Sequence, residues 1–91
     1  MALASDAEIN DFLASHPEWT LEAGELATTS TLKNFTEAMG LVTRIALIAE
    51  RSHHHPDIAI SWNKVSLRLS THSEGGITPR DLELAAHLPL T

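Results

Sequence analysis

Hydrophobic residues recur at two different spacings along this 91-residue chain, and the change of spacing marks its structural elements. Near the start, Ser5 is followed three residues later by Glu8, a pair typical of a capping box at the beginning of a helix. Apolar residues then recur at helical spacing until His16-Pro17, where the proline ends the run. The pattern predicts a short amphipathic helix between these points.

A longer helix is predicted in the middle of the chain. Asn34 and Glu37 form a second capping signature, and a wide apolar stripe follows them to near Glu50. A stripe of this width is typical of a helix that packs against the hydrophobic core. Its members are Phe35, Ala38, Met39, Val42, Ile45, Ala46 and Ala49.

Four strands are predicted, two on each side of this helix. Before the helix, two short apolar segments flank a polar turn at residues 22–25. After Pro56, apolar and polar residues alternate, which is the period of a strand with one buried face. A two-residue turn at Asn63-Lys64 divides this part into two strands. The four predicted strands are residues 19–21, 26–32, 58–62 and 65–70.

The last element begins with the clearest local signal in the chain. Thr78 is the expected N-cap, Pro79 takes the first helical position and Asp81 the third, so a helix is predicted from there to about Leu88. The order of elements is αββαββα. It predicts one domain over residues 1–91 of the α+β class, with a four-stranded antiparallel sheet and helices packed on one face.

Composition narrows the classes of function. Twelve acidic residues against 6 basic ones give a formal net charge of −6, which argues against direct nucleic-acid binding, since that affinity rests on cationic contacts. The absence of cysteine excludes a disulfide framework, a thiolate zinc site and a cysteine nucleophile. No apolar stretch reaches membrane-spanning length and the N-terminus has no basic region, so a cytoplasmic protein is expected. A core this small favours a shallow site or an oligomer.

Four of the six histidines lie in two clusters. The first is His53-His54-His55, at the end of the long helix, and the second is Thr71-His72, after the last strand. With a hairpin turn at Asn63-Lys64, the first cluster meets the second and His55 lies opposite His72. We therefore expect three imidazoles to converge at one end of the hairpin.

Such a cluster has three interpretations. Imidazoles titrate near neutral pH, so converging histidines suit general acid-base catalysis, the interpretation that we favour. Glu50 lies one helical turn before His54 and could orient its imidazole. A solvated surface turn is the second interpretation. The third is a divalent metal site, although no usual ligand spacing is present; its ligands would be Glu50, His54, His55 and His72.

Other polar and aromatic residues have mostly structural explanations. Ser70, His72 and Asp81 could form a nucleophilic triad on paper, but no nucleophile elbow supports it. Trp19, just before the first predicted strand, is either a packing residue or a partly exposed platform for a flat heterocycle. Gly75-Gly76 is explained by a turn that leads into the last helix.

Taken together, these motifs resemble the pterin-4a-carbinolamine dehydratases over nearly the whole chain. The combination of a His-His-Pro segment with a Thr-His segment at this separation is highly specific. The fold of that family, an antiparallel sheet with helices on one face, agrees with the predicted element order. The matching segments are Glu50-x-x-x-His54-His55-Pro56, Trp62-x-x-Val65-x-Leu67, Ser70-Thr71-His72 and Gly75-Gly76-Ile77-Thr78-x-x-Asp81.

The resemblance implies a reaction and a division of roles. The reaction is the dehydration of 4a-hydroxytetrahydropterin to quinonoid dihydropterin, in tetrahydropterin recycling, with no cofactor and no metal. His54 and His72 would be the acid-base pair, and His55 would mainly hold the pterin. The resemblance further implies a homodimer or homotetramer. The implied contributors to substrate binding are Glu50, Ser70, Thr71, Arg80 and Trp19.

The chain also departs from the pattern of the family. Thr28, Ser30 and Leu32 stand where relatives often carry a basic residue and aromatics, and His53 stands where an aspartate is familiar. Some members of the family act chiefly in assembly, as a dimerisation cofactor of a transcription factor or as Rubisco assembly factors. A non-catalytic assembly module is therefore the alternative function, and the intact histidines favour catalysis.

Overall fold

The computed structural model describes residues 2–91, and the elements have the predicted order. A 3-10 helix, η1 (His72–Glu74), follows the last strand. The α+β prediction, with a single four-stranded antiparallel sheet, is confirmed. The main elements are α1 (Asp6–Ser15), β1 (Thr20–Glu22), β2 (Glu25–Thr31), α2 (Phe35–Ser52), β3 (Asp57–Ser61), β4 (Lys64–Leu69) and α3 (Pro79–His87).

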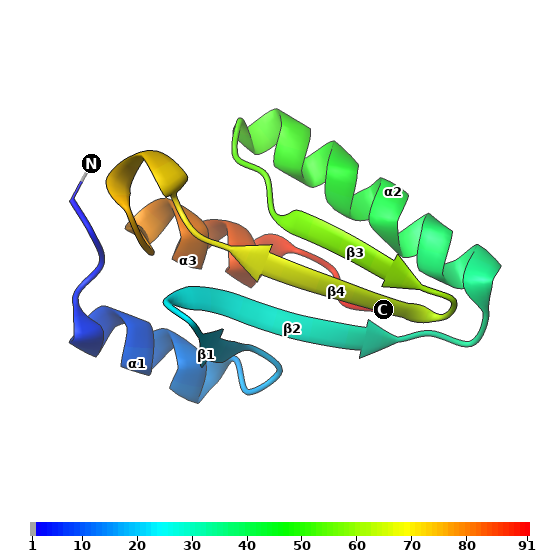
Figure 1. The fold of residues 1–91 in the computed structure, drawn as a ribbon, viewed down its shortest axis with the longest axis horizontal. Coiled ribbons are helices and arrows are strands. Elements are labelled where there is room, and N and C mark those ends of the chain that lie inside the picture. The colour runs from blue at the N-terminus through cyan, green and yellow to red at the C-terminus, as the bar shows by residue number, and fades with distance from the viewer. Residues whose placement is uncertain (1) are drawn as a thin grey trace.

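The strands lie in the order β1-β2-β4-β3, so that β1 and β3 form the two edges of the sheet. Figure 1 shows α2 and α3 behind the sheet, while its other face is open. Alternate side chains of β2 and β4 point toward α2 and are buried with it, because alternate residues of a strand face opposite sides. The largest apolar side chains that are completely buried are Leu26, Leu41, Ile45, Val65, Leu67 and Leu69.

The predicted helix caps are confirmed. Ser5 and Glu8 form the capping box of α1, and the Asn34 side chain accepts a hydrogen bond from the Glu37 backbone N–H at the start of α2. The turn between β1 and β2 is also where the sequence placed it. Its two central residues, Ala23 and Gly24, have φ of 51° and 78°, the left-handed conformation that a two-residue hairpin turn requires.

The hairpin between β3 and β4 turns one residue earlier than predicted. Its central residues are Trp62 and Asn63 rather than Asn63 and Lys64, so Val65 pairs with Ile60 and not with Trp62. Two bonds to Leu32 hold Asn63 in this position: its Nδ2 donates to the Leu32 carbonyl at 2.9 Å, and its own carbonyl accepts from the Leu32 N–H at 2.7 Å. The register therefore depends on a contact with the end of β2.

Candidate active site

The connection between α2 and β3 carries the first histidine cluster. Helix α2 ends at Ser52, and His53 follows in the left-handed conformation, with φ of 54°. Arg80, in the first turn of α3, donates from Nη2 to the His53 carbonyl at 2.8 Å. This bond ties α3 to the connection, so the predicted binding residue Arg80 has a structural role here.

His54 is bound to a buried carboxylate. Its Nε2 is hydrogen-bonded to Oδ1 of Asp81, which is fully buried, and the His54 side chain is itself only 12% exposed. The other Asp81 oxygen accepts bonds from the Thr71 hydroxyl at 2.8 Å and from the Thr78 backbone N–H at 2.9 Å. Buried carboxylates need such donors, because their desolvation is otherwise costly.

This contact fixes how the His54 ring is used. An ionised carboxylate can only accept hydrogen bonds, so the proton of neutral His54 lies on Nε2, facing Asp81. Nδ1 is then an unprotonated acceptor. The pair therefore presents a basic nitrogen on a ring that a buried anion holds in one orientation.

His55 and Glu50 form a separate, exposed pair. The His55 Nε2 lies 3.1 Å from Glu50 Oε1, and the two side chains are 63% and 82% exposed. The expectation that Glu50 orients His54 is therefore wrong: it contacts His55, and Asp81 contacts His54. An exposed pair of this kind adds little to stability, but it leaves both side chains accessible to a ligand.

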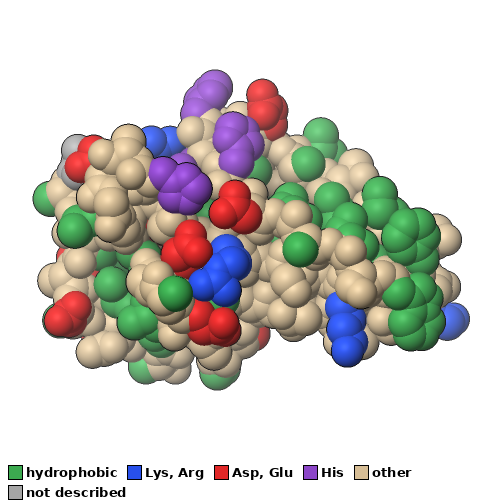
Figure 2. All heavy atoms as spheres, viewed as in Figure 1, with side chains coloured by type: hydrophobic (Ala, Val, Ile, Leu, Met, Phe, Trp, Pro, Cys, Tyr) green, Lys and Arg blue, Asp and Glu red, His purple; other side chains and the backbone are tan. Residues whose placement is uncertain are grey.

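His72 does not lie opposite His55, contrary to prediction. The earlier hairpin turn shifts the pairing, and β3 begins only at Asp57, so His55 pairs with no residue of β4. The His72 Nε2 instead lies 3.9 Å from Glu25 Oε2. Within residues 2–91, no hydrogen bond joins His54, His55 and His72 to one another. Figure 2 shows histidine side chains gathered over one end of the open face, beside acidic side chains.

His72 and His54 each line a separate hollow. His72, Glu25 and Ser70 line one of about 300 Å³, together with glycines from two turns. His54 and Arg80 line another of about 190 Å³. Both are small and open, in keeping with the shallow site that the size of the core predicted.

Trp19 is not a platform for ligands. Its side chain is only 2% exposed and belongs to the hydrophobic core. The prediction of a partly exposed indole is wrong, because Trp19 packs inward just before the short edge strand β1.

The two predicted hydroxyl contributors, Thr71 and Ser70, differ in their surroundings. Thr71 is buried, and its hydroxyl is bonded to Asp81 and Thr78. Ser70 lines the same hollow as His72, and its hydroxyl donates to Glu25 at 2.8 Å.

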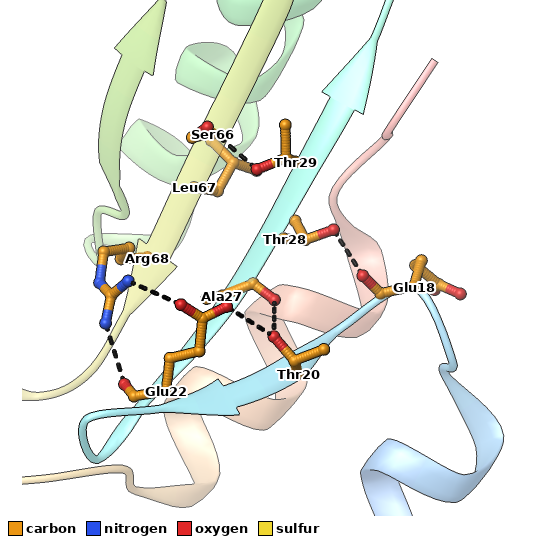
Figure 3. A pocket seen from close by; sticks show the side chains of 9 residues that line it. All are labelled: Glu18, Thr20, Glu22, Ala27, Thr28, Thr29, Ser66, Leu67 and Arg68. Carbon is orange, nitrogen blue, oxygen red and sulfur yellow. Dashed lines mark hydrogen bonds and ion pairs between the residues drawn. The ribbon is translucent and has the colours of Figure 1, made fainter.

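A further hollow, of about 440 Å³, lies on the open face of the sheet (Figure 3). Its walls carry threonine and serine hydroxyls and the Arg68 side chain. Arg68 Nη2 donates to the Glu22 carbonyl at 2.9 Å, and its Nε donates to Glu25 at 2.9 Å. The arginine therefore links this hollow to the carboxylate that lies next to His72.

Among the described acidic residues, Glu25 is the one whose pKa is clearly shifted from its ordinary value. The bond from Arg68, followed by the bond from Ser70, lowers the pKa of the Glu25 carboxyl below its ordinary value of 4.5. A carboxylate with a lowered pKa in the folded state stabilises the fold above its unfolded pKa, and this contribution disappears as the pH falls through the folded pKa.

We expect Glu25→Gln to reduce the loss of stability on acidification. The free energy of unfolding of the unmodified protein should fall below about pH 4.5, with Glu25 contributing at most about 1 kcal/mol because the pair is partly exposed. Urea denaturation between pH 6 and pH 3 measures this difference. Glu50→Gln, which removes an exposed carboxylate, is the control. Equal pH dependence in Glu25→Gln and the unmodified protein would contradict the assignment.

The sequence did not give three acidic residues of this region the histidine partners that the structure shows. Asp81 was predicted as a helix-capping residue and weighed as a triad partner of His72, but its contact with His54 was not predicted. Glu25 and Asp57 begin β2 and β3, and their proximity to His72 depends on strand pairing. The sequence offered one signal for the contact with His54, namely the capping residue Asp81, which follows the Thr71-His72 segment.

Comparison with known proteins identifies the chain. The fold and the shallow cluster of paired histidines and carboxylates define the class of this α+β protein. The family model "Pterin 4 alpha carbinolamine dehydratase" matches residues 2–89. The chain belongs to the pterin-4a-carbinolamine dehydratase family, which is a family of hydro-lyases.

Relatives and a solved structure agree with this assignment. A protein from Chloroflexus aurantiacus, assigned as a pterin-4-alpha-carbinolamine dehydratase, is 48% identical over 86 residues, covering 94% of this chain and 92% of its own. One from Thermomicrobium roseum with the same assignment is 48% identical over 88 residues, covering 97% and 95%. The crystal structure of a "transcriptional coactivator/pterin dehydratase" from Brucella melitensis has a TM-score of 0.88 at 30% identity and covers 94% of both chains.

The sequence predicted no membrane-spanning segment. Among residues 2–91, no helix is both long enough and apolar enough to cross a bilayer.

Proposed function

We propose that this protein removes water from 4a-hydroxytetrahydropterin, giving quinonoid dihydropterin, in the recycling of tetrahydropterin. The observation that carries the proposal is the contact of His54 with the buried Asp81, in a chain of this family. The contact supplies an oriented imidazole with a free nitrogen. His72, exposed beside Glu25, supplies a second imidazole that solvent and substrate can reach.

The proposed reaction needs one acid and one base. One imidazolium gives its proton to the 4a-hydroxyl group, and the bond between C4a and that oxygen breaks to release water. The other imidazole takes the proton from N5, and the electron pair of the N5–H bond forms the C4a–N5 double bond. Proton exchange with solvent restores the starting states of both rings. His54 and His72 are the proposed pair, and no step requires a metal or a cofactor.

The remaining candidate residues fall into two groups by exposure. His55, Glu50 and Ser70 have side chains that are at least partly accessible, and we assign them to contacts with the pterin. Thr71 is buried and bonded to Asp81, and Arg80 is bonded to the His53 carbonyl, so we assign both to support of the site. Backbone groups after β4 could also bind the donor and acceptor edge of a pterin.

The test is the rate at which chemically prepared 4a-hydroxytetrahydropterin loses water. With the protein added, quinonoid dihydropterin should form faster than in buffer, in proportion to protein concentration. Decay at the buffer rate would reject the catalytic proposal. It would leave a non-catalytic assembly module, the alternative that the family resemblance offers.

We further propose that the protein is a homo-oligomer assembled through the free edge of β3. This strand pairs only with β4, all five of its residues are exposed, and the side chains of Ile58 and Ile60 are each 37% exposed. An unpaired and partly apolar edge is a template for another strand. Other exposed large apolar side chains lie at the β3–β4 hairpin and on α2: Trp62, Phe35, Met39 and Leu47.

Ile60→Lys is expected to shift the protein from oligomer to monomer, because a charge at the paired edge would be buried without a partner. Sedimentation velocity over a range of protein concentrations measures the change. Leu21→Lys, on the opposite edge strand β1, where Leu21 is 50% exposed, is the control. If the two variants dissociate equally, or if the unmodified protein is a monomer, the proposed interface is wrong. Circular dichroism should verify that both variants are folded.

A further inference from the structure

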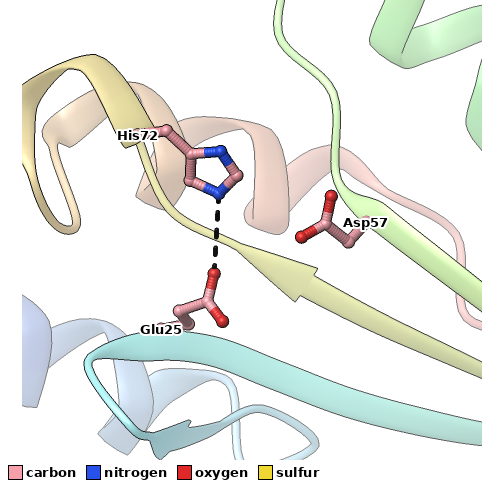
Figure 4. A group of neighbouring side chains, drawn as sticks. All are labelled: Glu25, Asp57 and His72. Carbon is pink, nitrogen blue, oxygen red and sulfur yellow. Dashed lines mark ion pairs between the residues drawn. The ribbon is translucent and has the colours of Figure 1, made fainter.

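Two carboxylates and one imidazole meet at the open face of the sheet. They are Glu25 at the start of β2, Asp57 at the start of β3 and His72 at the start of η1. A ligand atom from each lies within 4.8 Å of those of the other two. Figure 4 shows these side chains converging from separate segments of the chain. We propose that these residues form a binding site for a divalent transition-metal ion such as Zn²⁺.

The spacing of the ligand atoms is close to that of a metal site. Zinc binds nitrogen and carboxylate oxygen at roughly 2.0–2.2 Å, so two ligands of one ion lie up to about 4 Å apart. His72 Nε2 and Glu25 Oε2 are already 3.9 Å apart. Asp57 is exposed and the His72 side chain is 75% exposed, so small side-chain rotations can bring all three ligand atoms to the ion.

The charges favour a cation at this point. Glu25 is held by Arg68 and Ser70, and it keeps its Oε2 on the side of His72. The carboxylate of Asp57 has no hydrogen bond or ion pair within the described residues, although Glu25 is its neighbour. Two carboxylates this close repel each other unless a cation lies between them. The Arg68 guanidinium is shared with Glu22, so it does not neutralise all three acids.

The mixture of ligands indicates the class of ion. Imidazole nitrogen suits zinc, nickel and copper, whereas calcium and magnesium prefer oxygen ligands alone. Three protein ligands leave further positions for water, as in open zinc sites. The other described histidines of the region lack this arrangement, because His54 is bound to buried Asp81 and His55 has Glu50 as its single acidic contact.

Metal binding at this site would affect catalysis, and this inference alone rests on the proposed function. A metal ion on His72 would take up the imidazole that the dehydration needs, so bound zinc would inhibit the enzyme. The metal site is also different from the one considered from the sequence. The structure places Glu50, His54 and His55 in two other contacts, so they do not share one ion with His72.

Isothermal titration of untagged protein with zinc sulfate tests the site independently of any activity. We expect one zinc ion per chain and an affinity that falls about tenfold or more in Asp57→Asn, which corresponds to about 1.4 kcal/mol. This variant should fold normally, because the Asp57 side chain has no partner to lose. Glu25→Gln should weaken binding similarly, and Glu50→Gln, with the same change of charge beside His55, should leave the affinity within about twofold.

Two results would overturn the proposal. One is the absence of zinc binding by the unmodified protein. The other is binding that Asp57→Asn and Glu25→Gln leave unchanged, which would place the ion on the His53-His54-His55 segment instead. Failure of the dehydration assay would reject the proposed function but would not alter either titration result, so the two proposals can fail separately.

Discussion

Replacement of His72 or of His54 by alanine is expected to lower kcat for dehydration of 4a-hydroxytetrahydropterin by about 10²- to 10⁴-fold, the usual contribution of a general acid or base. His72 is 75% exposed and His54 is held on Asp81, so each variant removes one imidazole of the proposed pair. Stopped-flow detection of quinonoid dihydropterin measures the effect. The double variant should have a kcat only slightly lower than that of the less active single variant, since the two rings act in one step.

The control for these variants is His87→Ala. His87 lies at the end of α3, and among the described residues its ring is hydrogen-bonded to the Glu83 carbonyl alone, at 2.8 Å. This variant removes an imidazole of the same kind without touching the proposed site, so it should keep full activity. If it loses as much activity as His72→Ala, the loss reports a general change of the protein. If both site variants keep full activity, the acid-base assignment is wrong.

Asp81→Ala is expected to cause the largest loss of stability of any single replacement near the site. The carboxylate is fully buried and bonds His54, Thr71 and the Thr78 N–H. Its removal leaves these donors without an acceptor and opens a cavity, and loss of one partner of a buried pair typically costs about 3–5 kcal/mol. Urea denaturation followed by circular dichroism measures the difference in the free energy of unfolding.

Asp81→Asn separates stability from catalysis. An amide oxygen can still accept from Thr71 and Thr78, but the amide nitrogen would then face His54 Nε2 and reverse the preferred tautomer. We expect a smaller loss of stability than for alanine, together with a reduction of kcat. Thr71→Val, which removes one hydrogen bond from the carboxylate, should cost about 1–3 kcal/mol. A stability of Asp81→Ala equal to that of the unmodified protein would contradict the structural role of this aspartate.

Local signals in the sequence predicted the elements well, because the information lies within a few neighbouring residues. The Ser5 and Asn34 caps and the Thr78-Pro79 helix start all lie at helix ends in the structure. The order of elements then restricted the fold to an antiparallel sheet with helices on one face. The alternation after Pro56 predicted the buried and exposed faces of β4 correctly, whereas β3, predicted to have one buried face, has all its residues exposed.

The hairpin register could not be predicted in the same way. Moving the turn by one residue shifts each partner by two positions, which keeps every side chain on the same face. The hydrophobic pattern therefore fits both registers, and the bonds between Asn63 and Leu32 favour the observed one. Because the turn was misplaced, His55 was expected opposite His72, and this expectation failed.

The pairing of carboxylates with histidines in the site could not be predicted from the sequence either. The partner of His54 is Asp81, 27 residues later, and the acid nearest to His72 is Glu25, from a different part of the sheet. Glu50 was chosen from the sequence because it is close in the helix, yet the connection after His53 directs it to His55. The residue types of the site were thus predictable, whereas the pairing between them depends on the packing of α3 and the strands.

The most direct test of the account is the dehydration rate of 4a-hydroxytetrahydropterin with the unmodified protein in the presence of a strong metal chelator. The account predicts formation of quinonoid dihydropterin well above the buffer rate, undiminished by the chelator, because the two imidazoles supply the acid and the base. Decay at the buffer rate, with or without chelator, would contradict the proposed function. Catalysis that the chelator abolishes would contradict the metal-free mechanism.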